Sequence, residues 1–315
     1  MILAYSLIAV ALILLFAGAE MLVKGSASLA GRAGLTPLVI GLTVVAFGTS
    51  SPELAVSLKA AAAGQGDVAI GNVVGSNILN IALILGLAAV IFPITVHLQL
   101  IKVDVPIMIA VSALLPLLMR DGILGRAEGG VLFAGIVLYT VLNVLMARRG
   151  ADAEVEEEFA ESVPKQTKHW FIDLLLVGGG LAVLVIGSRL LVDNSIEVAR
   201  AYRISEAVIG LTIVALGTSM PELATSIIAA VRRQPDIALG NVIGSCIFNI
   251  LSILGLSASI IPVTSGGITL VDYAVMAGCA VVLLPFLMTG LRLGRIEGLV
   301  LLSVYGGYLY HLWPE

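Results

Sequence analysis

The chain has 315 residues, of which 59% are hydrophobic and only 12% are charged, and its mean hydropathy is +1.09. A soluble globular protein carries about 25% charged residues, so the composition excludes that class. The formal net charge of −4 says little, because in a membrane protein the placement of Lys and Arg matters more than the sum of charges.

Apolar segments long enough to cross a membrane follow one another along the chain. Helices of roughly 20 apolar residues can span the hydrocarbon layer, and we interpret ten segments in this way. Two of them are long and interrupted by Gly and Pro, so we expect broken helices there, at about 37–62 and 205–231. The predicted spans lie at about 2–23, 37–62, 68–92, 103–119, 127–147, 171–192, 205–231, 237–261, 270–290 and 296–312.

The two halves of the chain repeat one another at a constant offset. Residues 41–55 recur at 210–224, and residues 71–80 recur at 240–249. The offset is 169 positions, the difference between Glu222 and Glu53. Because each half contains an odd number of predicted spans, the second half must enter the membrane in the opposite direction. The fold class that we predict is an all-α polytopic membrane protein with ten transmembrane helices, arranged as two inverted-topology five-helix repeats.

This repeat divides the chain into three parts: a first five-helix repeat (1–147), an acidic linker (148–170) and a second five-helix repeat (171–315). The linker could bind regulatory Ca²⁺, but its length and charge are more typical of a solvated connection. Most of the 17 Lys and Arg fall in loops on the linker's side of the membrane. By the positive-inside rule we expect a cytoplasmic linker and both termini outside, in a plasma or inner membrane.

The first residues also resemble a signal peptide, since Ala17-Gly18-Ala19 is a small-residue cleavage pattern. Residues 1–10 contain no Lys or Arg, however, and a signal peptide begins with a basic region. Residues 16–23 also align with residues 185–192 of the second repeat. We therefore interpret residues 1–23 as a true membrane span.

Each repeat places one carboxylate, Glu53 or Glu222, inside an apolar segment. A charged side chain at the centre of a bilayer costs about 2.5–3.5 kcal/mol and is usually functional. Thr49 and Thr218 lie four residues earlier, on the same helix face. Pro52 and Pro221 lack an N–H and loosen the preceding turn. Carbonyls near that turn, including those of Ala46 and Ala215, can then face a cation.

The second repeated segment adds neutral oxygens. Ser76 and Asn80 are four residues apart, as are Ser245 and Asn249. Two carboxylates, two amides and several hydroxyls form an all-oxygen set, which suits hard cations such as Ca²⁺ or Na⁺ and is poor for zinc or copper. A single Glu could instead be a packing contact, but the duplication favours a site made by both halves. We interpret four further polar residues as helix-entry caps rather than ligands, namely Asp67, Asn72, Asp236 and Asn241.

One motif suggests an enzyme. Residues 64–67 read Gly-Gln-Gly-Asp, the pattern of intramembrane aspartyl proteases. The motif falls between two predicted spans, and Pro235 replaces Gly66 in the second repeat, so a turn is the better interpretation. We predict no enzyme activity, no cofactor and no nucleic-acid partner. Membrane lipid surrounds the chain, which we expect to be a monomer.

At these residues the chain resembles the cation/Ca²⁺ exchanger superfamily, whose two repeats carry G-[TS]-S-x-P-E followed by G-N-x-x-G-S-x-x-x-N/D. The resemblance covers both repeats and implies Na⁺-coupled Ca²⁺ antiport by alternating access. It implies that Ca²⁺ is held by Glu53, Glu222 and the carbonyls of Thr49 and Thr218. Flanking Na⁺ sites would add Ala46, Ser50, Ser76, Ala215, Ser219 and Ser245.

The resemblance also bears on the coupling ion. Some members, including the K⁺-dependent branch, have Asp where this chain has Asn249, so K⁺ co-transport is disfavoured and the middle site is electrically neutral. The H⁺-coupled branch typically carries a His after the second-motif Glu, and no His lies near here. An H⁺/Ca²⁺ antiporter remains the alternative, and a cation channel a weaker one. The resemblance further implies that helices within 2–33 and 171–203 slide over the others.

Overall fold

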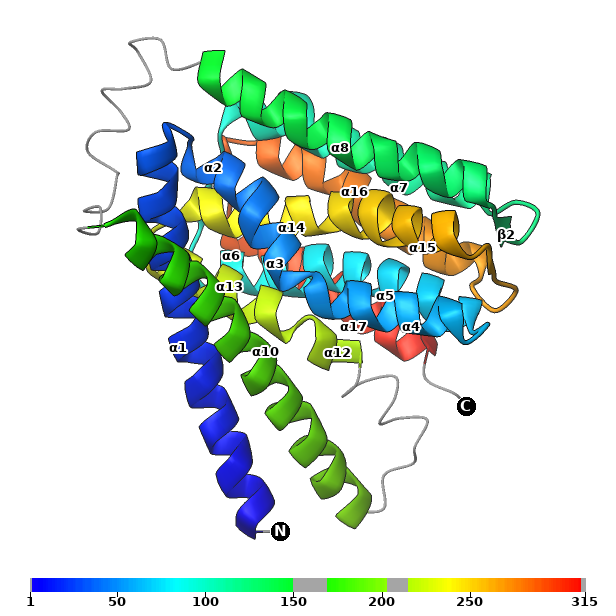
Figure 1. Ribbon diagram of the computed structural model, residues 1–315, viewed down its shortest axis with the longest axis horizontal. Coiled ribbons are helices and arrows are strands. Elements are labelled where there is room, and N and C mark those ends of the chain that lie inside the picture. The colour runs from blue at the N-terminus through cyan, green and yellow to red at the C-terminus, as the bar shows by residue number, and fades with distance from the viewer. Residues whose placement is uncertain (1, 150–168, 203–214, 313–315) are drawn as a thin grey trace.

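The computed structural model describes residues 2–149, 169–202 and 215–312. Within these ranges the chain is helical apart from short connections and four two-residue strands (Figure 1). The first repeat contains α1 (Ile2–Ala33), α2 (Pro37–Ile40), η1 (Gly41–Val45), α3 (Ala46–Thr49), α4 (Ser51–Ala62), α5 (Gly66–Ile78), η2 (Leu79–Leu85), α6 (Gly86–Ile91), β1 (Ile94–Thr95), η3 (Leu100–Asp104), α7 (Val105–Leu118), β2 (Ile123–Leu124) and α8 (Arg126–Arg149).

The described part of the second repeat follows the same order. It contains α10 (Trp170–Ala201), α12 (Ala215–Thr218), α13 (Met220–Val231), α14 (Pro235–Phe248), η5 (Asn249–Leu254), α15 (Gly255–Ile260), β3 (Val263–Thr264), α16 (Leu270–Met288), β4 (Arg292–Leu293) and α17 (Arg295–Leu312). Elements labelled η are π-helical turns. Among the described residues, seven helices are long and apolar enough to cross a membrane, or eight if the bent pair 37–49 and 51–62 counts as one span.

The predicted spans agree with these helices to within a few residues, with two exceptions. α1 and α10 continue to Ala33 and Ala201, about ten residues past the predicted ends. The predicted spans end where charged residues begin, but a helix continues until a residue adopts a conformation that ends it. For α1 that residue is Gly34, whose φ of +61° closes the helix while the Leu35 N–H donates to the Ala30 carbonyl at 3.0 Å, as in a Schellman motif. Residues 205–214 of the seventh span lie outside the described ranges.

Two small antiparallel ladders display the symmetry between the repeats. β1 pairs with β4 so that Ile94 faces Leu293, and β2 pairs with β3 so that Leu124 faces Val263. Adding the repeat offset to Ile94 gives Val263, and adding it to Leu124 gives Leu293. The same pair of contacts is therefore made twice with the halves exchanged, which confirms the predicted inverted repeat.

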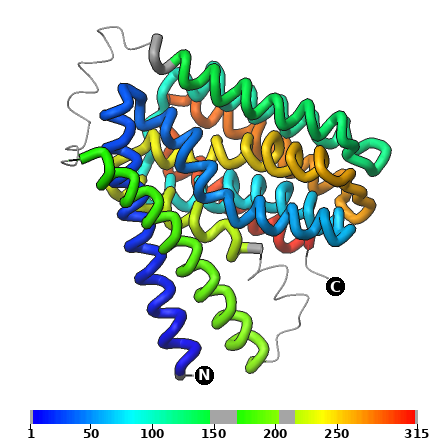
Figure 2. Tube along the Cα trace, viewed as in Figure 1, coloured from blue at the N-terminus to red at the C-terminus, as the bar shows by residue number. Residues whose placement is uncertain are grey.

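α1 and α10 pack against each other along their length and stand at a steep angle to the remaining helices (Figures 1 and 2). Glycines allow this close crossing: a Cβ on Gly18 would lie 2.9 Å from the Gly180 carbonyl oxygen. The other helices form a separate bundle around α14, in which every residue after Pro235 is buried. The bundle is thus the part of the molecule in which a dry site can form.

At the centre of the bundle, η1 crosses α14 where two glycines meet. A Cβ on Gly240 would lie 3.0 Å from the Gly41 Cα and 2.9 Å from the Leu38 oxygen. Because backbone atoms cannot move aside as side chains do, an added methyl must push the helices apart. At this crossing, the broken helix of the first repeat packs directly against α14 of the second repeat.

We therefore expect Gly240→Ala to destabilise the protein by about 1–3 kcal/mol, the usual cost of overpacking. Gly278→Ala is the matched control, since nothing lies within 4 Å of a Cβ at that helical position. The melting temperature of purified protein in detergent measures both. A Gly240→Ala melting temperature equal to that of Gly278→Ala would contradict the close crossing.

Candidate functional site

The helix that carries the glutamate, called the site helix below, is interrupted at the equivalent residue in both repeats. In the first, α3 ends at Thr49 and α4 begins at Ser51, with a bend of 47° between the two parts. In the second, α12 ends at Thr218 and α13 begins at Met220. Each new helix carries a proline in its first turn, a position where a missing N–H costs nothing. The breaks leave Ser50 and Ser219 between helical segments.

The two carboxylates are each held by the serine of the other repeat. The Ser219 hydroxyl donates to Glu53 Oε1 at 2.9 Å, and the Ser50 hydroxyl donates to Glu222 Oε1 at 2.9 Å. Both glutamates are 1% exposed. In each, Oε2 is buried without a hydrogen-bond partner. The structure therefore brings the sequence-predicted pair together and leaves one oxygen of each open.

The second motif lies beside this pair on α5–η2 and α14–η5. Ser76 Oγ is 3.4 Å from Ser219 Oγ, which joins the two motifs. Asn80 and Asn249 sit at the start of π-helical turns, which are rare and often occur at functional sites. The Asn249 amide donates to Asn77 Oδ1 at 3.0 Å. All four predicted residues of this motif, Ser76, Asn80, Ser245 and Asn249, are buried.

The backbone carbonyls behave less simply than predicted. The Ala46 oxygen accepts the Ser50 N–H at 3.0 Å and the Thr49 hydroxyl at 3.4 Å, so it is already bonded within its own helix. Pro221 has no N–H to bond the Gly217 oxygen four residues earlier, and this oxygen accepts the Ser188 hydroxyl of α10. Thr218 lies within hydrogen-bonding reach of Glu53. Ala215 begins α12, and its side chain lies outside the described residues.

The prediction that Asn72 and Asn241 cap helices is wrong. Both lie inside helices, α5 and α14, and both tie the site helix down. The Asn72 amide donates to the Glu53 carbonyl at 3.2 Å and to Ser57 Oγ at 2.9 Å. Asn241 makes the equivalent bonds to the Glu222 carbonyl and to Ser226. A signal existed in the sequence, because the asparagines are duplicated in register like the glutamates.

Asn241 adds a contact between repeats, since its Oδ1 accepts the Thr49 hydroxyl at 3.0 Å. Asp67 and Asp236, the other expected caps, lie in first turns but bind loops of the opposite repeat. Asp67 accepts the N–H groups of Gly266 and Gly267, each at 2.9 Å. Asp236 pairs with His97 at 3.2 Å. These polar side chains fix the positions of the site helices.

Five buried oxygens gather in the two motifs without a hydrogen-bond partner. They are Glu53 Oε2, Glu222 Oε2, Asn80 Oδ1, Asn249 Oδ1 and Ser245 Oγ. Each unmade bond at a buried polar atom costs about 1–3 kcal/mol. No group of three or more His, Cys, Asp or Glu capable of holding a metal occurs in the described parts of the chain. The donor set therefore fits a hard cation held by two carboxylates and neutral oxygens.

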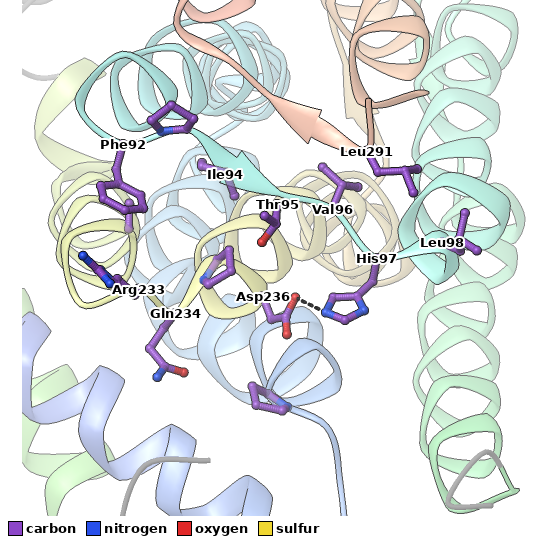
Figure 3. A pocket seen from close by; sticks show the side chains of 14 residues that line it. Phe92, Ile94, Thr95, Val96, His97, Leu98, Arg233, Gln234, Asp236 and Leu291 are labelled. Carbon is purple, nitrogen blue, oxygen red and sulfur yellow. Dashed lines mark ion pairs between the residues drawn. The ribbon is translucent and has the colours of Figure 1, made fainter. Parts of the chain in front are cut away.

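Two cavities in the described part of the chain lie away from these residues. One of about 680 Å³ opens between residues 92–98 and 230–236 (Figure 3). In it, Asp236 meets His97, and the Arg233 guanidinium lies 5.8 Å above the Phe92 ring. A second cavity, of about 720 Å³, is lined by residues of the 64–68, 121–122 and 264–266 segments. The predicted site residues line neither of these two cavities, and both carboxylates are buried.

Comparisons with known proteins identify the family of the chain. A family model described as sodium/calcium exchanger protein matches residues 3–145 and 172–313. The chain belongs to the sodium/calcium exchanger family. Family membership makes it a transporter and a multi-pass membrane protein rather than an enzyme. The Gly-Gln-Gly-Asp motif covers the end of the connection between α4 and α5 and the first two residues of α5.

Several known proteins match most or all of the chain. The protein CaxA of Alkalimonas amylolytica is 40% identical over 100% of both chains. The inner membrane protein YrbG of Escherichia coli is 42% identical over 83% of this chain and 81% of its own length. The sodium–calcium exchanger NCX_Mj, in a structure soaked with zero Na⁺ and Ca²⁺, has a TM-score of 0.84 at 32% identity over 99% of both chains. This likeness extends the ten-helix, two-repeat fold to the full chain.

We expect Asn72→Ala to lower the stability of this exchanger-family chain by about 1–3 kcal/mol, because Ser57 and the Glu53 carbonyl lose a buried donor. Ser303→Ala is the control: its exposed hydroxyl bonds only to the Leu299 carbonyl of its own helix. Thermal unfolding of both variants in detergent provides the comparison. If Asn72→Ala unfolds at the wild-type temperature, the asparagine does not hold the site helix.

Proposed function

We propose that the protein is a secondary active antiporter that exchanges Ca²⁺ for Na⁺ by alternating access. The observation that carries this proposal is the reciprocal pair of bonds between Ser50 and Glu222 and between Ser219 and Glu53. Each bond occupies one carboxylate oxygen and leaves Oε2 without a partner in a dry interior. Two negative charges kept there need a cation, since buried charge without a counter-charge is strongly unfavourable.

In this proposal Ca²⁺ lies between the repeats. Its ligands are the open oxygens of Glu53 and Glu222 and the backbone carbonyls of Thr49 and Thr218. Two carboxylates balance the two charges of one Ca²⁺, and carboxylate and carbonyl oxygens are its preferred ligands. The Ser–Glu bonds hold both carboxylates in place, so little ordering is needed when the ion enters.

Na⁺ takes the same carboxylates and the neutral oxygens beside them. The proposed Na⁺ ligands, besides the Glu and Thr oxygens, come from Ala46, Ser50, Ser76, Asn80, Ala215, Ser219, Ser245 and Asn249. Because the ions share Glu53 and Glu222, binding of one excludes the other. If three Na⁺ exchange for one Ca²⁺, each cycle moves one charge, worth about 2.3 kcal/mol per 100 mV.

Alternating access requires that one part of the protein moves over another. We assign the movement to the pair α1 and α10, which pack on each other and touch the site helices at glycines. A Cβ on Gly48 would meet Leu181, and one on Gly217 would meet Val192. The pair carries none of the proposed ligands. Its motion would therefore expose Glu53 and Glu222 to one side at a time without dismantling the site.

The arrangement in the cell is also proposed. The repeats occupy 1–147 and 171–315, and the acidic linker 148–170 faces the cytoplasm. Both termini then lie outside a plasma or inner membrane. We propose that a single chain is the transporting unit, because both carboxylates come from the same chain.

Glu53→Gln and Glu222→Gln should each reduce Ca²⁺ transport to background, because each removes one of the two charges that balance Ca²⁺. Glu297→Gln, in the first turn of α17 and outside the site, is the control and should transport normally. Uptake of ⁴⁵Ca²⁺ into proteoliposomes measures all three variants. Transport near the wild-type rate in both site variants would contradict the ligand assignment.

Imposed gradients identify the coupling ion. An outward Na⁺ gradient should drive ⁴⁵Ca²⁺ into proteoliposomes, whereas K⁺ or H⁺ gradients of the same size should not. A proton-driven uptake would instead make the protein an H⁺/Ca²⁺ antiporter on the same site. Ca²⁺ flux that needs no counter-cation on the far side would indicate a channel and contradict antiport.

A further inference from the structure

The buried carboxylate of Asp104 lies outside the site described above. Asp104 ends the π-helical turn η3 at the start of α7 and is 0% exposed. Its Oδ1 accepts the Tyr139 hydroxyl of α8 at 2.8 Å, while its Oδ2 is buried with no hydrogen-bond partner. An ionisable residue inside a spanning helix usually marks a functional position, and π-helical turns often do so as well.

The second repeat contains a matched aspartate–tyrosine pair that serves as a reference. The Tyr308 hydroxyl donates to Asp272 Oδ1, also at 2.8 Å. Tyr308 is the repeat equivalent of Tyr139, but the aspartate is displaced by one residue. Asp272 Oδ2 accepts the N–H and the hydroxyl of Thr269, each at 2.7 Å. Asp272 is thus a fully bonded capping residue, whereas Asp104 has an open oxygen.

The surroundings of Asp104 contain no counter-charge among its hydrogen-bonding neighbours. Tyr139 is neutral, and the next side chains in the network are amides: Asn143 donates to the Tyr139 carbonyl at 3.2 Å and accepts from Gln99 at 3.1 Å. Gln99 is half-buried, so the network approaches water at the end of the bundle that holds the Figure 3 cavity.

Among the described side chains, the elements packed against η3 and α7 supply no counter-charge either. On α8, the charged residues Arg126 and Glu128 lie at least 11 residues before Tyr139, which is about 16 Å or more along the helix. α14 and α16 carry the titratable groups Asp236, Cys246, Asp272, Tyr273 and Cys279. Asp236 is paired with His97, and the remaining groups are acids or neutral at physiological pH. Lys102, on η3 itself, is exposed. An ionised Asp104 would therefore be an uncompensated buried charge, which is the costly case.

We propose that Asp104 is a second ion-binding site, separate from the two glutamates, and that its ligand is a proton held on Oδ2. Tyr139 then donates to the carbonyl oxygen of a neutral carboxylic acid. The proton neutralises the interface between α7 and α8, and its release would place a negative charge there. Because the site shares no residue with Glu53 or Glu222, it does not depend on the proposed transport reaction.

Infrared spectroscopy of the full-length protein tests this directly. The background carries Glu53→Gln and Glu222→Gln, so that neither glutamate contributes a carboxylic acid band. At neutral pH this variant should show one protonated-carboxyl C=O band that shifts in D₂O. Adding Asp104→Asn should remove the band, whereas adding Asp272→Asn should leave it. Adding Tyr139→Phe should shift the band by removing its hydrogen bond, which keeps the test valid should Asp104→Asn fail to fold.

Stability against pH gives an independent readout. If the folded protein holds one more proton than the unfolded chain, the folding equilibrium constant falls by up to tenfold per pH unit as the pH rises. Asp104→Asn should remove this slope and Asp272→Asn should keep it. Absence of the band, its survival in Asp104→Asn, or stabilisation by Na⁺ that requires Asp104 would each overturn the proton assignment.

Discussion

The organisation of this protein depends on one exchanged interaction, in which each repeat holds the carboxylate of the other. Ser50 lies in the first repeat and binds Glu222, and Ser219 lies in the second and binds Glu53. Both serines lie where the helix is broken, and each side chain reaches across to the other repeat. The proline that follows each break interrupts the helix, because it has no N–H and its ring clashes with the carbonyl four residues earlier. Fold and site thus share one origin in the sequence.

Most of the contacts that surround the two glutamates occur in both repeats, and a few equivalent residues have different partners. Asn72 and Asn241 make equivalent bonds, and the two strand ladders have the same register. By contrast, Asp67 is bound by backbone N–H groups, whereas its equivalent Asp236 is bound by a histidine. Symmetry is kept both beside the glutamates and in the strand ladders that join helix ends. It is lost in the partners of Asp67 and Asp236 and at Asp104, which lies in a helix outside the repeated motifs.

Much of the fold and the two glutamates could be predicted because the duplication is evident in the amino-acid sequence. A single carboxylate in an apolar segment could be a packing contact, but two at equivalent positions of the repeats indicate a functional site. The pairing of Glu53 with Ser219 was beyond reach, since it depends on how the halves face each other. Asn72 was misinterpreted because an Asn near a helix start is usually a cap, and only the fold places it inside α5 facing Ser57.

Helix ends and carbonyl directions were harder to predict for another physical reason. Hydropathy indicates which residues lie in the hydrocarbon layer and does not indicate where a helix ends. α1 and α10 continue through polar residues because no earlier residue interrupts the helical backbone. The Ala46 carbonyl was expected to open toward an ion, yet the break after Thr49 leaves it bonded to the Ser50 N–H. Proline removes one donor from a turn, and neighbouring donors compete for the carbonyls it releases. The Gly217 oxygen, taken by Ser188 of α10, follows the same rule.

That last bond connects the site to the helices assigned to move. Ser188 lies on α10, and the Gly217 carbonyl lies one residue before Thr218 in the broken helix. If α10 slides, this hydrogen bond must break or be exchanged, and the carbonyls of the turn become free to change direction. Their freedom would then depend on the position of α10, while the carboxylates remain held by serines within the bundle. In such an arrangement the carboxylates bind the cation, while the backbone carbonyls of the turn respond to the position of α10. This division suits a transporter whose single site opens to one side of the membrane at a time.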